Sequence, residues 1–588
     1  PNSRRARRRA GWSILGIYDG HNAGAALISS DGQVIAAVEE ERFSRIKNHD
    51  ARPGQNLPPH ESIAFCLAAS PEHVTRIAFG LAHPDELTRI AMANFDAHVA
   101  AGENQRLDRA EELGLTEAEL RDLPAVTQRR RLDTLRIAAA NAGLEAATPV
   151  EFVDHHAAHA GGAYLLSGLE RALVVTLDGK GDDHSGSVSV GDHGSIVRTL
   201  ELPTEASLGH LYSAFTVACG LRPQRDEGKL QAMAASGSID RRIRSWLESR
   251  FELDGRTGAI RGRLSDGLVV GPYPDRRPDL HNDLVREVIG GSPVVDAAAT
   301  VQSFLEQLIA EFVTWHLTQT GLRKLVVSGG VFATVGLNLR LADLGALDRL
   351  HVHPAMTDAG IALGAAAVTS AAEGTPPRPL RGLGIGPAYS DQECAQAFER
   401  EGYHVTSPSL DAEVVLGATL ARGEVVARFV GGAEYGPRAL GNRSILAPAT
   451  DPRMPARLNR MLRRSMIMPF APMARSRDAV DLFADVPALA DSLRTMTAAI
   501  PCTAETRRRY PAVVHADGTA RPQLLDDHEA ATSILDELER RTGQRVIINT
   551  SFNLHDEPMV CRPTDAASSA RAAGIATVQI GSLLAELK

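Results

Sequence analysis

The chain has 588 residues, a formal net charge of −9, a hydrophobic share of 44% and an aromatic share of only 4%, the composition of a globular protein with aliphatic cores. This length predicts two or more domains. The acidic balance argues against a nucleic-acid partner, and the lack of a long apolar run argues against a membrane-spanning helix.

The cysteines and the first residues bear on the cellular compartment. Cysteine occurs five times at widely separated positions and never as a Cys-x-x-Cys pair. This pattern predicts reduced thiols in the cytoplasm instead of a disulfide framework or a zinc finger. Residues 1–12 are expected to be a disordered leader, because five arginines crowd the first ten positions and no signal-peptide core follows them.

The first ordered stretch reads as three strands, at 13–18, 25–29 and 34–38. The small-residue turn between the first two strands can hold a phosphate against backbone amides. His21 lies at its tip and is either a polar loop residue or a general base or phosphate ligand, since imidazole titrates near neutrality. The charged run 39–48 that follows is either a solvated helix start or, through residues such as Lys47, the lining of an anionic pocket. Residues 60–150 are predicted to be mainly helical.

The stretch 154–183 predicts a metal site. His155 and His159 are four positions apart, so on a helix they project from one face and can share a metal ion. The buried strand 172–177 ends at Asp178, where an open α/β sheet places ligands, and glycines follow. Asp178 is a third candidate ligand and Asp358 a fourth, although Asp358 is also a plausible helix N-cap. Two imidazoles and two carboxylates suit Fe(II), Mn(II) or Zn(II).

Two further glycine-bearing turns suggest contacts with a nucleotide. Gly228-Lys229 before a small-residue helix is a weak phosphate-binding hint. The strand 324–327 ends at Gly329-Gly330, which lets a base or ribose approach the backbone, and Asn338 follows on the next predicted helix. Helices are predicted at 208–218, 296–317 and 360–372.

Residues 373–388 are predicted to be a linker, because prolines and glycines cluster there. Beyond it, Arg438 and Arg443 lie five apart in a turn-rich frame, and the planar fork of arginine matches phosphate or carboxylate oxygens. A predicted strand at 545–548 runs into Asn549-Thr550-Ser551. This half therefore favours a nucleotide or phosphate pocket, with surface arginines paired to acids as the alternative.

The plan of strand, glycine-bearing turn and strand or helix recurs near residues 19, 178 and 329. Actin-like sugar kinases and chaperone ATPases bind nucleotide through three such loops between two halves. This analogy concerns architecture and does not establish an activity.

Seven ordered motifs resemble the NodU/CmcH family of O-carbamoyltransferases. The similarity extends over nearly the whole chain from Ile14 onward. The motifs are His21-Asn22-Ala23, Glu39-Glu40-Glu41-Arg42-Phe43, His155-x-x-x-His159, Gly228-Lys229-Leu230, Gly436-Pro437-Arg438-Ala439-Leu440-Gly441-Asn442-Arg443, Pro469-Phe470-Ala471-Pro472 and Asn549-Thr550-Ser551-Phe552-Asn553.

The resemblance implies an α/β protein of two parts. An N-terminal actin-like (ASKHA) domain with two RNase H-like halves would span 13–372, and a C-terminal YrdC-like α/β domain would span 389–588. The C-terminal part would form carbamoyladenylate from carbamoyl phosphate and Mg²⁺-bound ATP. The N-terminal part would hold that intermediate on a metal, commonly Fe²⁺, and pass the carbamoyl group to a hydroxyl.

The resemblance also implies residue roles. The metal ligands would be His155, His159, Asp178 and Asp358, and the base for the acceptor would be His21. Lys47 and Lys229 would contact the adenylate or help to channel it. Carbamoyl phosphate and ATP would be held by Arg438, Arg443, Arg521 and Ser551. Family members often carry a basic residue before Pro-Phe-Ala-Pro, where this chain has Met468, so Arg463 or Arg464 is expected to take over a phosphate contact.

Three functions follow from these expectations. The first is ATP-dependent carbamoylation of a hydroxyl on a small-molecule natural product such as a macrolide, an aminoglycoside or a sugar. The second is a threonylcarbamoyl-type enzyme that modifies tRNA, which the acidic balance and the lack of a basic face argue against. The third is a non-catalytic actin-like nucleotide-binding module, which leaves the C-terminal arginines unexplained. A homodimer is the default expectation for the assembly.

Overall fold

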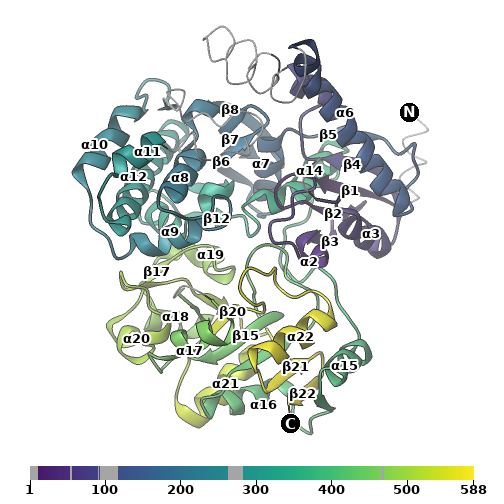
Figure 1. Cartoon of the computed structure of the whole chain (residues 1–588), viewed down its shortest axis with the longest axis vertical. Helices are drawn as coiled ribbons and strands as arrows, with labels where there is room; N and C mark the ends of the chain where they lie inside the picture. Colours follow the sequence, from purple (N-terminus) through teal and green to yellow (C-terminus); the bar gives the residue numbers. More distant parts are fainter. Residues whose placement is uncertain are drawn as a thin grey trace.

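The computed structural model describes residues 11–52, 56–89, 92, 117–262, 283–464 and 469–587. The N-terminal two thirds form two sheets with their helices, side by side, and the residues after about 389 form a third body beneath both (Figure 1). Residues 1–10 of the predicted leader, most of residues 90–116 and Met468 lie outside the described residues, whereas Trp12, assigned to that leader, begins the first strand.

The first sheet has the strand order β3-β2-β1-β4-β5. Strands β1, β2 and β3 pair antiparallel, and β4 and β5 then add in parallel. Its strands are β1 (Trp12–Tyr18), β2 (Gly24–Ser29), β3 (Val34–Glu39), β4 (His73–Phe79) and β5 (Val150–Phe152), and the helices nearby are α2 (Glu41–Ser44), α3 (His60–Ala69) and α6 (Glu117–Asn141).

The second sheet repeats this plan, with the order β12-β11-β6-β7-β8. Strands β6, β7 and β8 are antiparallel neighbours, and β11 and β12 are parallel to β6. Its strands are β6 (Arg171–Gly181), β7 (His184–Asp192), β8 (Ser195–Pro203), β11 (Lys324–Ser328) and β12 (Arg349–Val352). Two sheets with one strand order confirm the predicted pair of RNase H-like halves.

Helices cover the outer face of the second sheet. Helix α8 covers Leu208–Ala218, as predicted, and α12 is longer than predicted. The helices here are α8, α9 (Glu227–Ala234), α10 (Arg241–Arg250), α11 (Asp283–Ile289), α12 (Val294–Thr320) and α13 (Val335–Ala342), with the short hairpin β9 (Phe251–Leu253) and β10 (Ile260–Gly262) between them.

Two helices of small residues fill the space between the sheets. Helix α7 (His155–Leu165) packs on α14 (Ile361–Ala372), and α14 returns from the second sheet to pack on β1, β2 and β4. A Cβ atom on Gly364 would lie 2.0 Å from the carbonyl oxygen of Ala158, so only glycine allows this approach. The side chain of Asp154 caps α7 by accepting the N–H of Ala157 at 2.8 Å.

The C-terminal body is built on a sheet with the strand order β13-β22-β21-β14-β15-β20-β16-β19. Helices α16 (Ala412–Ala421) and α21 (Thr532–Thr542) pack together on one face of it. The strands are β13 (Tyr403–Thr406), β14 (Val426–Phe429), β15 (Arg443–Pro448), β16 (Ala471–Arg475), β19 (Gln523–Leu525), β20 (Ile547–Ser551), β21 (Thr577–Ile580) and β22 (Leu583–Leu587).

The remaining elements of this body lie around the sheet. A two-stranded ribbon, β17 (Ile500–Pro501) with β18 (Thr519–Ala520), lies apart from it. The helices are α15 (Asp391–Arg400), α17 (Met454–Met461), α18 (Ala479–Leu482), α19 (Ala490–Arg494), α20 (Ala504–Arg509) and α22 (Pro563–Ala573). The α/β fold class predicted from the resemblance is therefore confirmed.

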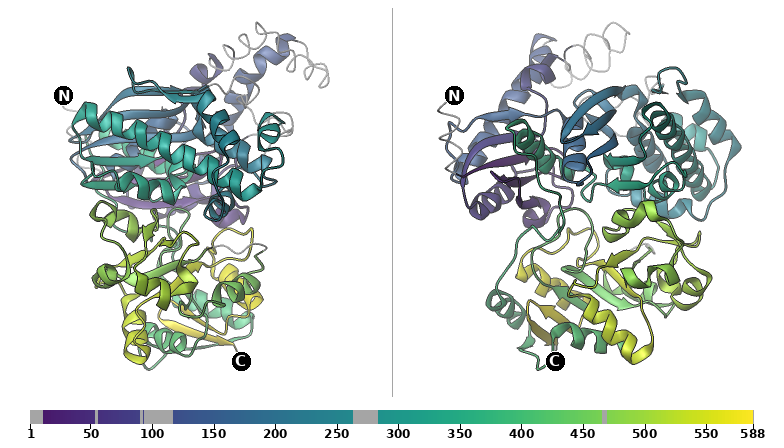
Figure 2. Two further views of the ribbon diagram at one scale, coloured as in Figure 1. Left: turned by 90° about the vertical axis from the view of Figure 1, so that its left-hand side faces the viewer. Right: turned by 180° about the vertical axis from the view of Figure 1, so that it is seen from behind.

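The C-terminal body contacts both N-terminal sheets (Figure 2). Beside the first sheet, Arg45 donates to the carbonyl oxygen of Met559 at 2.8 Å. Beside the second, the Asn338 amide donates to the carbonyl oxygen of Thr497 at 2.7 Å, and the N–H of Ala499 donates to Val335 at 3.0 Å. Among the described residues, no helix has the length and apolar character needed to cross a membrane.

Candidate metal centre and anion site

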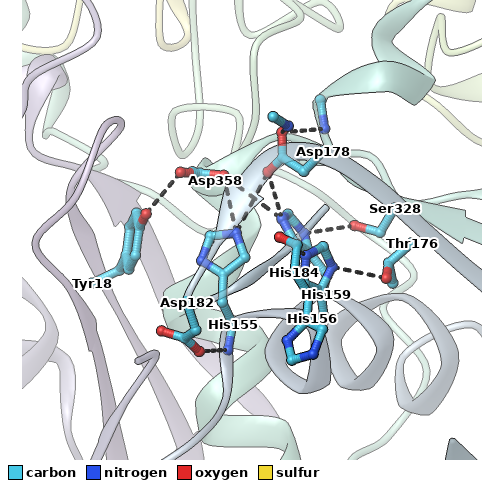
Figure 3. A network of polar contacts seen from close by, with 12 residues as sticks. Tyr18, His155, His156, His159, Thr176, Asp178, Asp182, His184, Ser328 and Asp358 are labelled. Atoms are coloured by element: carbon cyan, nitrogen blue, oxygen red, sulfur yellow. Dashed lines mark hydrogen bonds and ion pairs between the residues drawn. The ribbon is translucent and has the colours of Figure 1, made fainter. Parts of the chain in front are cut away.

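Four side chains meet where α7, β6 and the turn after β12 converge (Figure 3). Their nearest ligand atoms, from His155, His159, Asp178 and Asp358, all lie within 4.8 Å of one another. Asp178 Oδ2 is 3.4 Å from His155 Nε2 and 3.2 Å from His159 Nε2. Asp358 Oδ1 is 3.6 Å from each imidazole Nε2.

The local sequence explains how these groups come together. His155 and His159 are one helical turn apart on α7, as the spacing predicted. Asp178 lies on β6 beyond its buried segment, and Asp358 begins a 3-10 turn after β12. The carboxylate of Asp358 caps no helix, so the N-cap alternative for this residue is wrong.

The donor set fits a divalent transition metal. Bonds of about 2.0–2.2 Å from one ion to N and O ligands place neighbouring ligand atoms about 3.0–3.6 Å apart in octahedral or tetrahedral geometry. The four imidazole–carboxylate separations run from 3.2 to 3.6 Å. Two neutral imidazoles and two carboxylates would also cancel the charge of a divalent ion.

Without a cation, the carboxylates act on the imidazoles. Burial opposes the charged form of His155, but Asp358 and Asp178 outweigh it and raise the pKa of His155 to about 9. Burial also opposes ionisation of Asp178, yet hydrogen bonds from His155 and His159 hold the pKa of Asp178 well below its ordinary value. The ligand-free cluster therefore holds a proton where a metal ion would sit.

Neighbouring side chains that the sequence reading missed fix the ligands. The Tyr18 hydroxyl donates to Asp358 Oδ2 at 2.7 Å, and Ser328 Oγ lies 3.1 Å from His159 Nδ1. The backbone N–H of Gly330 donates to Asp178 Oδ1 at 3.3 Å. Tyr18 and Ser328 both end strands, β1 and β11, and strand ends are where this fold class gathers functional groups.

The glycines predicted to approach a nucleotide lie beside this cluster. Gly329 has φ +104°, and a Cβ atom there would lie 2.1 Å from the carbonyl oxygen of Leu177. The turn thus brings the end of β11 against β6, next to Asp178. Asn338 uses its amide hydrogens on the carbonyl oxygens of Phe332 and Thr497, at 2.8 and 2.7 Å, so only its Oδ1 is left for a ligand.

His21 lies in the turn after β1 and is half-buried. Ion pairs surround this turn: Asp19 accepts from Arg131, and Asp50 accepts from Arg52 at 2.9 Å. Burial raises the pKa of Asp50, but the hydrogen bonds and the charge of Arg52 outweigh this effect and lower it. The charge of His21 adds a smaller contribution in the same direction. His21 thus lies within electrostatic reach of Asp50.

A second group of residues forms in the C-terminal body, where arginines lack acidic partners. No hydrogen bond or ion pair to Arg438 or Arg521 occurs among the residues described. Burial lowers the pKa of Arg438 to about 10. Burial and, secondarily, the charge of Arg438 hold the pKa of Arg521 well below its ordinary value. Two neighbouring buried guanidiniums without a carboxylate form a candidate anion site.

Arg464 belongs to the same set. Its guanidinium reaches Thr550 Oγ1 at 3.4 Å, lies over the Phe470 ring at 5.5 Å, and has a pKa lowered to about 10 by burial. Ser551, at the end of β20, donates to Asn553 Oδ1 at 2.5 Å and is half-buried.

Arg443 and Asn549 are engaged within the protein. Arg443 is fully buried, stacks over Phe429 at 3.9 Å, and donates to carbonyl oxygens of residues including Val430 and Pro387, at 2.6 and 2.9 Å. These bonds hold the loop before β15 in place, and the expected contact of Arg443 with carbamoyl phosphate or ATP stays a prediction. Asn549 donates to Ala439 at 3.0 Å.

Two lysines of the N-terminal part, Lys47 and Lys229, lie near His555 and Arg464 of the C-terminal body. Lys229 pairs with Asp226 at 2.8 Å on α9. Burial lowers the pKa of Lys47, and its charged neighbours include Glu41, Arg225 and Arg464. Lys47 lies in the turn after α2 and Arg464 in the C-terminal body, so this basic cluster spans the contact between the two parts of the chain.

Comparison with known proteins covers nearly the whole chain. The family model for the carbamoyltransferase N-terminus matches residues 13–367, and that for the carbamoyltransferase C-terminus matches residues 417–586. Nodulation protein NolNO of Sinorhizobium fredii is 31% identical over 576 residues, covering 95% of this chain and 78% of the relative. Nodulation protein NolO of Bradyrhizobium diazoefficiens is 33% identical, covering 70% and 75%.

Similarity to solved structures is low. Full-length HypF in its phosphate- and nucleotide-bound form matches 62% of this chain and 55% of its own with a TM-score of 0.32 and 13% identity.

Proposed function

Because the chain belongs to the carbamoyltransferase family, we propose that it is an ATP-dependent O-carbamoyltransferase that works in two steps. In the first, carbamoyl phosphate, ATP and water give carbamoyladenylate, phosphate and pyrophosphate. In the second, the carbamoyl group passes to the hydroxyl of a small-molecule natural product and AMP leaves. The family membership supports carbamoyl transfer, and the two groups of residues support the division into steps.

The first step is assigned to the C-terminal body, residues 389–588. Carbamoyl phosphate and the phosphates of Mg²⁺-bound ATP are anions, and Arg438, Arg521 and Arg464 present guanidiniums without acidic partners. Binding an anion there would remove the repulsion between Arg438 and Arg521. Ser551 and the N–H groups of its turn would complete the phosphate contacts.

The second step is assigned to the N-terminal part, residues 13–372. The cluster of His155, His159, Asp178 and Asp358 would hold Fe²⁺, or Zn²⁺ or Mn²⁺, with these four as protein ligands. A metal ion bound there would neutralise negative charge on the adenylate. The protein groups around it orient Asp358 through Tyr18 and His159 through Ser328.

His21 is proposed as the base that takes the proton from the acceptor hydroxyl. Imidazole titrates near neutrality, and this side chain is half-buried in the turn that leads away from Tyr18. Asp19, on the same turn, is paired with Arg131. Against the effect of its burial, the bonds that Asp50 accepts from Arg52 lower the pKa of Asp50, so Asp50 is a weaker base than a free carboxylate.

The transfer of carbamoyladenylate between steps would follow the basic residues of the interface. Lys47 and Arg225 lie near Arg464, and Lys229 lies on α9 beside them. These cations suit carbamoyladenylate, an anionic mixed anhydride of carbamic acid and AMP that hydrolyses if released into bulk water. Housing both steps in one chain would limit that loss.

The single observation that carries this proposal is the presence in one chain of a metal-type cluster and an unpaired arginine site. The test uses anaerobically purified protein with ATP, Mg²⁺ and carbamoyl phosphate, and no acceptor. Pyrophosphate release that depends on carbamoyl phosphate is expected. Its absence under every metal condition would overturn the proposal and favour a nucleotide-binding module without catalysis.

A further inference from the structure

The segment Glu434–Arg443 leaves the C-terminal sheet and is held by N-terminal residues. The N–H of Gly436 donates to Glu39 Oε1 at 2.8 Å, and Arg42 Nη2 donates to the carbonyl oxygen of Gly436 at 2.7 Å. Glu39 and Arg42 are each 3% exposed and lie 3.3 Å apart as an ion pair. The charged run after β3 is therefore neither a solvated helix start nor the lining of an anion pocket at Arg42.

The same segment also touches the loop that carries Asp358. The hydroxyl of Tyr435, a residue 3% exposed, donates to the carbonyl oxygen of Ala359 at 3.0 Å. Gly436 has φ +96°, and a Cβ atom there would lie 3.0 Å from the carbonyl oxygen of Pro354. The backbone of the segment thus lies directly on the turn between β12 and α14.

At its other end the segment is tied to the C-terminal sheet. Glu434 Oε1 accepts the N–H groups of Leu440, Asn442 and Arg443 at 2.7, 2.8 and 3.1 Å. Arg438 lies between these two fixed points, and Pro437 before it restricts the backbone further. Only two residues separate Tyr435 from Arg438 along the chain.

We propose that Tyr435 is a positioning residue that couples occupancy of the metal cluster to anion binding at Arg438. This inference rests on the proposed function of the two groups. A cation that draws Asp358 inward fixes Ala359, the hydrogen bond fixes Tyr435, and the short path through Gly436 and Pro437 fixes Arg438. Coupling between two sites is reciprocal, so carbamoyl phosphate at Arg438 also tightens metal binding at Asp358.

The test compares Tyr435→Phe with a matched control, Tyr403→Phe. Tyr403 is also 3% exposed and donates to a backbone carbonyl oxygen, that of Ile575, at 2.8 Å, but it lies on the edge strand β13. Full-length protein is stripped of metal, and its affinity for Zn²⁺ is measured by calorimetry with and without saturating carbamoyl phosphate. Release of pyrophosphate by the wild type is assayed separately.

In the wild type and in Tyr403→Phe, carbamoyl phosphate is expected to tighten Zn²⁺ binding about 3- to 10-fold, the range of one buried hydrogen bond. In Tyr435→Phe, the ratio of the Zn²⁺ affinity with carbamoyl phosphate to the Zn²⁺ affinity without it is expected to fall toward one. Glu39→Gln, which removes the ion-pair partner of Arg42 and keeps an acceptor for Gly436, is expected to weaken the coupling in the same direction.

The coupling is overturned if the wild type shows no effect of carbamoyl phosphate on Zn²⁺ affinity. It is equally overturned if Tyr435→Phe and Glu39→Gln keep the wild-type ratio, or if Tyr403→Phe loses it as they do. If the wild type releases no pyrophosphate, that result would instead count against the proposed function. The effect of carbamoyl phosphate on Zn²⁺ affinity in the wild type and the variants would still decide whether the two sites are coupled.

Discussion

Replacing Arg438 by methionine should make the ligand-free protein more stable while removing its activity. Arg438 has no acidic partner in the structure, and burial lowers the pKa of its guanidinium to about 10. The folded-state pKa is thus below the unfolded one, so the charged form is disfavoured by folding. At pH 7, which is below both pKa values, the guanidinium is charged in the folded and the unfolded state, so the full free-energy cost of burying the charge lowers the stability of the fold.

The magnitude follows from the pKa. A fall from 12.5 to about 10 corresponds to about 3 kcal/mol at 1.36 kcal/mol per unit. Since the side chain keeps part of its solvent contact, this figure is reduced to about 1–2 kcal/mol. Methionine retains most of the aliphatic stem. The unfolding midpoint of the C-terminal body should rise by roughly 2–4 °C per kcal/mol.

The assay is calorimetry of full-length protein with and without carbamoyl phosphate. Wild type should be stabilised by the ligand, by about 2.7 kcal/mol at a hundredfold excess over Kd, and Arg438→Met should not. A matched control is Arg475, which is 1% exposed and bonded to Asp478, Asp536 and Glu539. Arg475→Met leaves those carboxylates unpaired and should destabilise by about 2–4 kcal/mol.

If Arg438→Met unfolds at a lower temperature than the wild type and is still stabilised by carbamoyl phosphate, then Arg438 is a structural residue. The unpaired guanidinium would then have no part in an anion site.

Three further predictions concern the N-terminal part. Asp178→Asn should weaken binding of Zn²⁺ or Fe²⁺ by at least about 10-fold while leaving pyrophosphate release intact, and metal analysis after dialysis that finds wild-type content would contradict the ligand role. The pKa of His155 in metal-free protein is raised to about 9, so the stability that its protonated form contributes is complete below about pH 6.5 and is lost as the pH rises toward 9. Metal affinity should therefore increase over that interval, with proton release measurable by calorimetry in buffers of different ionisation enthalpy, and a pH-independent affinity would argue against it. His21→Ala should release pyrophosphate at the wild-type rate but transfer no carbamoyl group to an acceptor, whereas equal loss of both steps would assign His21 another role.

Much of the N-terminal site could be predicted because its signals are local. The i, i+4 spacing of His155 and His159 needs only a helix to bring both imidazoles to one face. Asp178 comes directly after a predicted strand, and the ends of strands in an open α/β sheet are where ligands bind. Tyr18 escaped notice because its role depends on Asp358, 340 positions away.

The C-terminal half was less predictable for a physical reason. An arginine in a turn-rich stretch reads as exposed, and Arg438 and Arg443 have the same local surroundings in the sequence. The structure separates them, because Arg443 starts β15 and is fully buried against Phe429 and backbone carbonyl oxygens, while Arg438 keeps solvent contact. Which guanidinium is engaged by the protein depends on tertiary contacts that no short motif encodes.

The two contacts of the C-terminal body have a mechanical consequence. Three rigid bodies that each touch the other two form a closed ring, and such a ring has no single free hinge. Separating the two N-terminal sheets, as two-lobed enzymes commonly do to admit ligands, would break the bond of Arg45 to Met559 or that of Asn338 to Thr497. Any opening between the two N-terminal sheets is therefore coupled to the seating of the C-terminal body, which carries the arginine site.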